Sequence, residues 1–368
     1  MNWQQVGKVM IGTSLALGAA AASAQQAPGT YPAVTRIYNN VPETIENYNY
    51  GVCSTFGSSP EALSCYHNWG VQRATSTQFP NGKVLLFTRT AGPRHASIGT
   101  KLPPGLNPPL VANNNTQKDM IRLLNAEGIA VDYTEDINAF TNLNQYAAII
   151  FFDGSRESMW NHGNYVVPSM AVSTSTTAQL DSAKINLRQY MRAGGGFVAV
   201  HNAFGTEYNW PWYEGLLGNG NYFDHGGFRT GNVEIAAVDP STANIGPPGT
   251  EFGFQDEWYT MVPFPTGVKV LANLDIGTQT SQCNGLPCYY TTGNSSLPPA
   301  QTSGFEPITW CHYYDGGRAW LTVLGHDGSA TSDVSLPPPP NSVPGRAQFQ
   351  RLLVDGIKSA MGLIPFCT

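Results

Sequence analysis

A histidine follows a short apolar segment near the middle of the chain. Residues 197–200 are all apolar, they come after three glycines, and His201 follows them directly. An all-apolar strand of this kind is typical of a parallel sheet covered on both faces, and open α/β sheets bind their ligands just beyond the carboxyl ends of such strands. The sequence therefore predicts that the imidazole of His201 takes part in chemistry, as a proton-transfer group or as a metal ligand.

Further polar side chains follow other predicted strands. Because the carboxyl ends of parallel strands meet at one edge of a sheet, we expect these side chains to lie near His201. They are Arg94 and His95 after the strand 84–88, Asp153 after the strand 146–152, and His326 with Asp327 after the strand 318–324.

Two adjacent carboxylates stand beside two large aromatic residues in the string Asp256-Glu257-Trp258-Tyr259. Such a group can orient an imidazole, act as a general base, or bind a sugar ring against an aromatic face. A surface loop anchored by its aromatic residues explains the same string, and the sequence leaves both interpretations open. In the catalytic interpretation Glu257 is the carboxylate partner of His201.

Metal binding is a second possibility for the histidines. His225 and His326, like His201, lie in turns flanked by glycine or aromatic residues, and imidazoles with a carboxylate are typical ligands of zinc. No HExxH or HxH motif is present, so a divalent metal such as zinc is a hypothesis and the cofactor stays open. We expect structural roles for His67, His162 and His312.

An acyl-enzyme mechanism is not expected. The chain has no Gly-x-Ser-x-Gly motif, and His201 and Asn202 occupy the turn after the glycine-preceded strand, where a Cys or Ser nucleophile would stand.

The amino terminus predicts export. Lys8 precedes an apolar stretch that ends in Ala22-Ser23-Ala24, a small-x-small cleavage site, so residues 1–24 are expected to be a signal peptide and the protein to be secreted or periplasmic. No later stretch reaches the ~20 apolar residues of a membrane span. The net charge of −6 argues against nucleic acid or an anionic membrane as partner, and the weakly charged surface suits a carbohydrate or another small molecule.

Six cysteines in an exported chain favour disulfides over thiol chemistry. The sequence does not determine their connectivity. The economical pairing joins Cys53 to Cys65, Cys283 to Cys288 and Cys311 to Cys367.

The order of predicted elements indicates an α/β fold with a mainly parallel sheet. Residues 25–82 show no helical period and are expected to be an extension, and residues 83–368 one domain. Strands are predicted at 84–88, 129–133, 146–152, 196–200, 232–238, 268–274, 307–314 and 318–324, and helices at 117–127, 177–192, 210–220 and 347–361. Residues 239–253 are expected to form a loop, and 315–317 the turn of a hairpin.

Residues 83–362 resemble the ThuA-like (trehalose-utilisation) family. The resemblance is carried, in order, by Val84–Thr88 with Arg94–Ile98, Thr134-Glu135-Asp136 with Phe140, Gly194–His201, Trp212-Tyr213 with Leu217-Gly218, Phe223-x-His225, Asp256–Tyr259, Pro307–His312, Gly317-Arg318-Ala319, and Leu324-Gly325-His326. It implies a flavodoxin-like, class I glutamine-amidotransferase-like three-layer sandwich and a carbohydrate context, but not the reaction.

Together these observations predict an exported carbohydrate-active enzyme. His201, Glu257 and His326 are its expected catalytic residues, and His201, His225 and His326 its expected metal ligands. The alternative is a non-catalytic glycan-binding protein that uses Trp210, Trp212, Trp258 and Trp310 as stacking surfaces. The residues expected to bind substrate are Arg94, His95, Asn202, Asp256, Trp258 and Tyr259.

Overall fold

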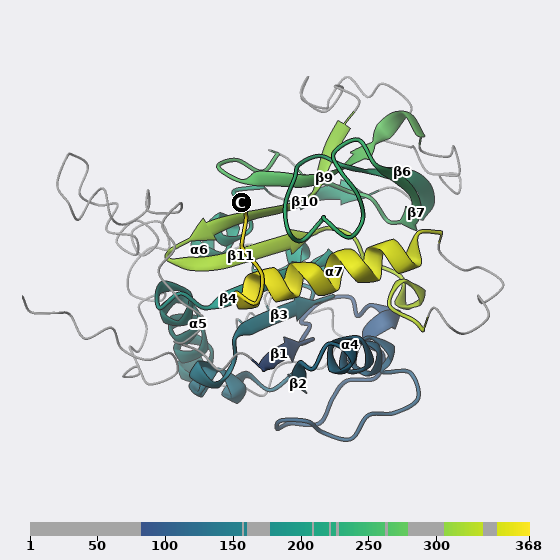
Figure 1. The fold of residues 1–368 in the computed structure, drawn as a ribbon. Helices are drawn as coiled ribbons and strands as arrows, with labels where there is room; N and C mark the ends of the chain where they lie inside the picture. The colour runs from purple at the N-terminus through teal and green to yellow at the C-terminus, as the bar shows by residue number, and fades with distance from the viewer. Residues whose placement is uncertain are drawn as a thin grey trace, which may run out of the picture.

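Five parallel strands form one half of a large sheet (Figure 1). The computed structural model describes residues 82–156, 158–159, 177–207, 210–220, 222–225, 228–261, 264–278, 305–333 and 344–368. In sheet order, the parallel strands are β2 (Ala130–Thr134), β1 (Lys83–Phe87), β3 (Ala148–Phe152), β4 (Gly196–Val200) and β11 (Gly317–Thr322). The side chains of β3 and β4 are buried along the whole length of each strand, as expected for strands covered on both faces.

Antiparallel strands extend the sheet beyond β11. They are β10 (Phe305–Tyr314), β9 (Lys269–Asp275), β6 (Arg229–Ile235) and β7 (Glu251–Asp256), which bring the sheet to nine strands. A separate antiparallel pair joins β5 (Tyr222–His225) to β8 (Tyr259–Met261).

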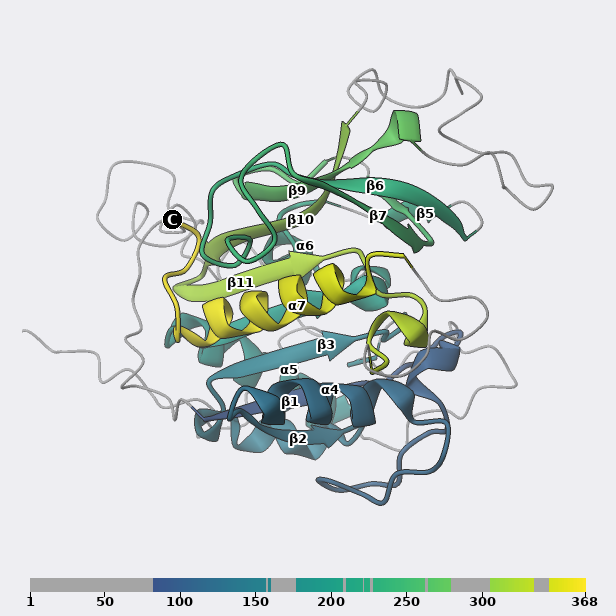
Figure 2. The ribbon, with the colours of Figure 1, turned by 45° about the vertical axis from the view of Figure 1, so that its right-hand side comes forward.

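Helices cover both faces of the sheet (Figure 2). On one face lie α4 (Asn115–Ala126) and α7 (Arg346–Met361), and Trp320 of β11 packs closely against Gly356 of α7. On the other face lie α5 (Thr177–Arg192) and α6 (Pro211–Leu216), where the ring of Phe197 meets that of Tyr213 at 6.0 Å. Short 3-10 helices complete the connections: η2 (Ala96–Ile98), η3 (Ile137–Thr141), η4 (Leu143–Gln145), η5 (His201–Gly205), η6 (Ile276–Thr278) and η8 (Gly328–Ala330).

The register of the parallel strands brings their carboxyl ends together. Val200 at the end of β4 pairs with Phe152 of β3 on one side and with Thr322 of β11 on the other. Phe87 of β1 pairs with Phe151 of β3. The residues that follow these four strands therefore lie along one edge of the sheet, as predicted.

The prediction of alternating strands and helices is confirmed, with shifts of a few residues at the ends of elements. The parallel order holds from β2 to β11, while half of the strand pairings in the sheet are antiparallel. The prediction missed β5, β7 and β8, and β7 begins inside the segment expected to be a loop. The inward residues Phe252, Phe254 and Asp256 alternate along β7, but a glycine and polar residues between them weaken the apolar pattern.

The Cys311–Cys367 disulfide is present and ties the carboxyl-terminal tail to β10. Lys269 and Asp239 also hold Thr368 at the end of the tail, with the Thr368 amide donating to Asp239 Oδ2 at 3.0 Å. The expected pairs Cys53–Cys65 and Cys283–Cys288 lie outside the described residues, as do the expected signal peptide, nearly all of the extension, His67 and His162. No helix in the described part of the chain is long and apolar enough to cross a membrane.

Candidate metal centre

Four side chains from separate parts of the fold converge at the carboxyl edge of the parallel strands. His95 follows β1, His201 follows β4, Glu257 lies between β7 and β8, and His326 follows β11. One nitrogen or oxygen atom from each of them lies within 4.8 Å of the corresponding atoms of the other three. Three imidazoles and a carboxylate are a donor set that suits a divalent metal ion.

The three imidazole rings pack edge to face around a common centre. The ring centroids of His95 and His201 are 5.2 Å apart, those of His95 and His326 5.1 Å, and those of His201 and His326 5.0 Å. His201 forms the buried floor of the cluster, whereas the side chains of His326 and Glu257 are 30% and 20% exposed. The cluster is therefore accessible from solvent on one side.

His201 is held in one tautomer. Its Nδ1 lies 2.9 Å from the carbonyl oxygen of Val323. A carbonyl only accepts, so Nδ1 carries the proton and the lone pair is on Nε2, which faces the other cluster residues. Burial above all holds the pKa of His201 well below its usual value, which keeps the ring neutral. A carbonyl that fixes the ring through its second nitrogen is a common feature of metal-binding histidines.

His326 and Glu257 form an ion pair inside the cluster. His326 Nδ1 lies 3.1 Å from Glu257 Oε2 and 3.2 Å from His201 Nε2, so two acceptors point at one donor. Burial acts to lower the pKa of His326, but its hydrogen bond and ion pair with Glu257 raise it overall. Burial likewise acts to raise the pKa of Glu257, and the contacts with His326 and His225 lower it overall.

These distances fit a metal site. Zinc bonds of about 2.0–2.1 Å in a tetrahedron place neighbouring ligand atoms about 3.3 Å apart, close to the two short separations around His326 Nδ1. His95 adds a buried Nδ1 that has no hydrogen-bond partner among the described residues. Burial also lowers the pKa of His95 to about 4, so that ring is neutral and able to donate a lone pair.

Two residues at the cluster have a strained backbone conformation. His201 has φ 49° and Asp153, which follows β3 as His201 follows β4, has φ 53°. This left-handed region is unfavourable for residues other than glycine, by about 1–3 kcal/mol, and such strain is often found at functional sites.

The strain predicts an unusual stability order for two variants of His201. Both His201→Ala and His201→Gly lose the ring, but alanine keeps the strained φ, so we expect the glycine variant to be more stable by about 1 kcal/mol. Urea unfolding measures the difference. The matched pair Val198→Ala and Val198→Gly lies on β4, the strand that His201 follows, and has no positive φ, so it should show the opposite order. An alanine variant of His201 as stable as the glycine variant would contradict the strain argument.

His225 lies beside the cluster rather than within it. Its Nδ1 is 3.5 Å from Glu257 Oε2, and its ring stacks on Tyr259 at 5.6 Å. It is not one of the four residues whose donor atoms converge. Of the expected ligands His201, His225 and His326, the structure brings together His201 and His326, and it adds His95 and Glu257 to them. The side chain of His225 is 34% exposed, so a ligand at the cluster can reach it.

Asp153 adds a buried carboxyl group close by. Its Oδ2 accepts a hydrogen bond from Ser97 Oγ, and its Oδ1 has no partner among the described residues. Burial raises its pKa to about 8, so this group is largely neutral at neutral pH.

Asn202 and Tyr259 support His201. The Tyr259 hydroxyl donates to Asn202 Oδ1 at 2.9 Å, Asn202 Nδ2 donates to Ser155 Oγ at 2.5 Å, and the Tyr259 ring lies 4.3 Å from the His201 ring. The predicted contact of Asn202 and Tyr259 with substrate stays a prediction. The Tyr259 ring packs against one side of the His201 imidazole, and Asn202 holds the Tyr259 hydroxyl.

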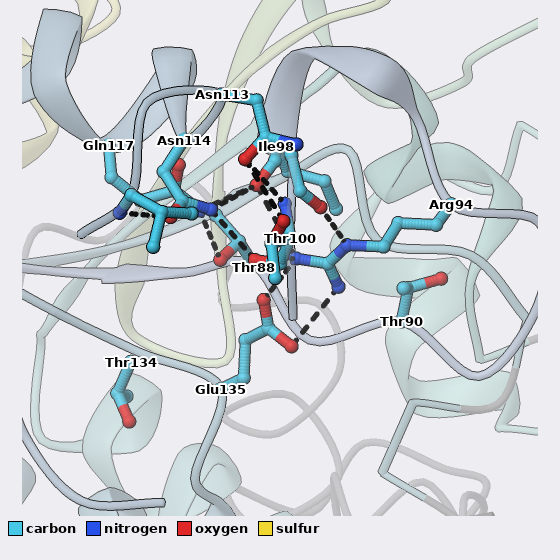
Figure 3. A network of polar contacts seen from close by, with 12 residues as sticks. Thr88, Thr90, Arg94, Ile98, Thr100, Asn113, Asn114, Gln117, Thr134 and Glu135 are labelled. Atoms are coloured by element: carbon cyan, nitrogen blue, oxygen red, sulfur yellow. Dashed lines mark hydrogen bonds and ion pairs between the residues drawn. The ribbon is translucent and has the colours of Figure 1, made fainter. Parts of the chain in front are cut away.

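Arg94 holds together the loop that carries His95 (Figure 3). Its guanidinium forms an ion pair with Glu135, donates to the carbonyls of Gly99 and Thr100, and so joins the loop after β1 to the loop after β2. Asn114 Nδ2 donates to two carbonyls of the same loop. These contacts hold the loop of His95 in place, and the predicted contact of Arg94 with substrate stays a prediction.

Asp256 and Trp258 of the Asp256–Tyr259 string are buried in the protein interior. Asp256 is 1% exposed, and its carboxylate accepts from backbone amides, while burial raises its pKa to about 7. Trp258 is fully buried, and its indole nitrogen donates to the Arg229 carbonyl at 2.9 Å. The expectation that Asp256 and Trp258 bind substrate is therefore wrong.

The tryptophans expected to stack on a glycan are also core residues. Each is 0% exposed, because the indole rings pack between the sheet and the elements that cover it. Trp310 donates to the Leu217 carbonyl, and Trp212 packs against Tyr314. The stacking surface proposed for Trp210, Trp212, Trp258 and Trp310 is thus not present. His312 is buried and bound to the Leu216 carbonyl, as expected for a structural histidine.

The sequence interpretation found three of the four converging residues and assigned the fourth, His95, to substrate binding. Its position in the loop that follows a parallel strand was the available signal. No comparable signal marked Ser97, which lies in the short helix η2. Its hydroxyl donates a hydrogen bond to Asp153, the buried carboxyl group close to the cluster.

Several solved structures are similar to this chain. A ThuA-like protein from Bacteroides uniformis ATCC 8492 is 19% identical, with 78% of this chain and 94% of that chain covered and a TM-score of 0.48. One from Parabacteroides merdae ATCC 43184 is 14% identical, with 76% and 89% covered and a TM-score of 0.46. A beta-galactosidase from Rahnella sp. R3 is 15% identical, with 78% and 32% covered and a TM-score of 0.40.

A search of curated proteins found no match. The family model ThuA, described as "Trehalose utilisation", matches residues 83–335. This match begins at β1, ends just after η8, and includes all four residues of the cluster. The chain therefore belongs to the ThuA family.

Proposed function

We propose that this protein is an exported, carbohydrate-active enzyme of the ThuA family whose cluster of His95, His201, Glu257 and His326 holds a divalent metal such as zinc. The observation that carries the proposal is the convergence of four donor atoms within 4.8 Å on elements far apart in the sequence. Buried histidines are costly unless their nitrogens are used, and here one buried nitrogen of His95 has no partner among the described residues.

Several residues have distinct roles in this proposal. His201 offers Nε2 because the Val323 carbonyl fixes its tautomer, and Tyr259 holds the ring from one face. A bound divalent ion would polarise a sugar oxygen or a water molecule. His225 lies outside the ligand set, next to Glu257, and its side chain is partly exposed. Its ring can therefore donate a proton to a bound sugar or accept one from it.

The carbohydrate context and the compartment come from the family and from the sequence. The family description names trehalose utilisation, which makes a sugar or glycoside the substrate class to test first. The predicted leader at residues 1–24 supports a periplasmic or extracellular compartment in this proposal. We also assign the parallel half of the sheet, with helices on both faces, to a flavodoxin-like, class I glutamine-amidotransferase-like sandwich.

A glycan-binding protein without catalysis is the alternative. The aromatic surface that it was expected to use is buried, which removes the residues that favoured it. Binding of a glycan without any turnover would nevertheless make this alternative the favoured function.

Metal-dependent turnover of a sugar tests the proposal. Purified protein is screened for product formation on oligosaccharides, glycosides and oxidised sugars, then chelated, and then given back zinc, manganese or cobalt. We expect product from at least one substrate, loss of most turnover on chelation, and recovery with one of the metals. Turnover that chelation leaves unchanged would overturn the metal-assisted site, and binding without product from any substrate would overturn the enzyme.

A further inference from the structure

Asp256 links the two cluster residues that the sheet itself does not hold together. It is the last residue of β7 and is 1% exposed. Oδ2 accepts from the Gly325 amide at 2.7 Å, and Oδ1 accepts from the His326 amide at 3.1 Å and from the Glu257 amide at 2.9 Å. One side chain therefore binds the backbone of both Glu257 and His326.

The topology of the sheet makes this link necessary. Glu257 follows β7 and His326 follows β11, and β10, β9 and β6 lie between those two strands. A small change of twist at each of the intervening pairings would move the two side chains apart. His95 and His201 differ in this respect, because their strands β1 and β4 both pair with β3, and β4 also pairs with β11.

The turn that carries His326 depends on the same contact. Gly325 has φ 119°, a conformation that L side chains rarely adopt, and a Cβ there would approach Val200 Cγ1 to 3.1 Å. The backbone of this turn is thus determined by packing against β4 on one side and by the carboxylate of Asp256 on the other.

We propose that Asp256 is a positioning residue of the metal centre: it sets the affinity for the metal by holding Glu257 and His326 in register, without touching the metal. This inference rests on the proposed metal site. Partners outside the ligand shell typically change metal affinity by about 10–100-fold when they are mutated, because the ligands must then be ordered at the cost of binding energy.

Zinc affinity of Asp256→Asn tests the proposal. The amide keeps the size of the side chain and one acceptor oxygen for His326 and Glu257, but it turns an NH2 group toward the Gly325 amide, which is also a donor. We expect zinc affinity, measured by competition with a chromophoric chelator, to fall by about 10–100-fold. The cobalt-loaded variant should also show a d–d spectrum altered from that of the wild type.

Asp239→Asn is the matched control. Asp239 is also a buried aspartate that accepts backbone amides, from Ser241 at 3.0 Å and from Thr368 at 3.0 Å, but it lies at the carboxyl-terminal tail. Its substitution should lower stability without changing zinc affinity. Equal losses of affinity in both variants, or an Asp256→Asn protein that binds zinc like the wild type, would overturn the positioning role.

The wild type supplies a measurement that does not need the variant to fold. If Asp256 orders the site in advance, the amides of Gly325, His326 and Glu257 should be protected from hydrogen exchange in the metal-free protein. Rapid exchange at these amides before zinc is added would count against the proposal. A wild type that binds no zinc at all would remove the proposed function and this inference together, whereas zinc binding with an unaffected Asp256→Asn variant removes the inference alone.

Discussion

Protein purified without chelator should carry close to one divalent metal ion per chain, and His201→Ala should lose most of its metal on dialysis. His201 is the buried floor of the cluster, and its Nε2 faces the other donors in a tautomer fixed by Val323. Structural zinc sites with four ligands bind with about 10–16 kcal/mol, so the loss of one ligand costs roughly 3 kcal/mol, or about 10²-fold in affinity. Elemental analysis of the dialysed protein measures the stoichiometry.

A second buried histidine provides the control for this experiment. His312 is also buried and bound through one nitrogen to a carbonyl, that of Leu216, but it lies on β10 and outside the cluster. His312→Ala should lose stability and keep its metal. If both alanine variants keep the metal, the ion is bound elsewhere, and if the wild type carries none even after zinc is added, the cluster is not a metal site.

Glu257→Gln should reduce turnover by about 10²–10⁴-fold at saturating metal while sugar binding changes little. Glutamine keeps the shape of the side chain and an oxygen, but it removes the negative charge that faces His326 at 3.1 Å and His225 at 3.5 Å. Whether this charge acts on the metal or on an imidazolium, it is needed during the reaction more than for binding. Measurement of kcat and KM on the substrate found by screening separates the two effects.

Glu251→Gln is the comparison variant for Glu257. Glu251 begins β7, the strand that Glu257 follows, and its carboxylate accepts from Asn232 at the surface. Its substitution removes the same charge from the chain and should leave turnover unchanged. An equal fall in both variants would point to net charge rather than to the cluster, and full activity of Glu257→Gln would exclude Glu257 from the chemistry.

Local pattern in the sequence was enough to predict the elements that carry the site. Glycine before a fully apolar run predicted β4 at 196–200, and the amphipathic pattern predicted α5 at its observed bounds. These patterns are local because burial of a strand on both faces needs a continuous apolar run, and a helix needs its own period. Parallel strands then share an edge, which is why His201 and His326 could be placed together before their distance was known.

Burial of the aromatic residues could not be read from the sequence. Trp258 stands beside two carboxylates and a tyrosine, which resembles the composition of a sugar site, yet its ring lies in the core and its indole nitrogen is bound to a carbonyl. An indole suits a core and an exposed platform equally well, and contacts between distant segments decide which one it occupies.

The sequence by itself determined the α/β alternation, the ThuA-like character and the placement of His201, Glu257 and His326 as the residues of interest. Only the tertiary structure decided that His95 completes the cluster while His225 stands beside it, that Arg94 joins two loops, and that Asp256 is buried and binds backbone amides. The physical reason is that these roles depend on distances of a few ångströms between segments up to 231 residues apart, from His95 to His326. Such distances follow from strand order, register and turn geometry across the whole sheet, and no local run of residues encodes them.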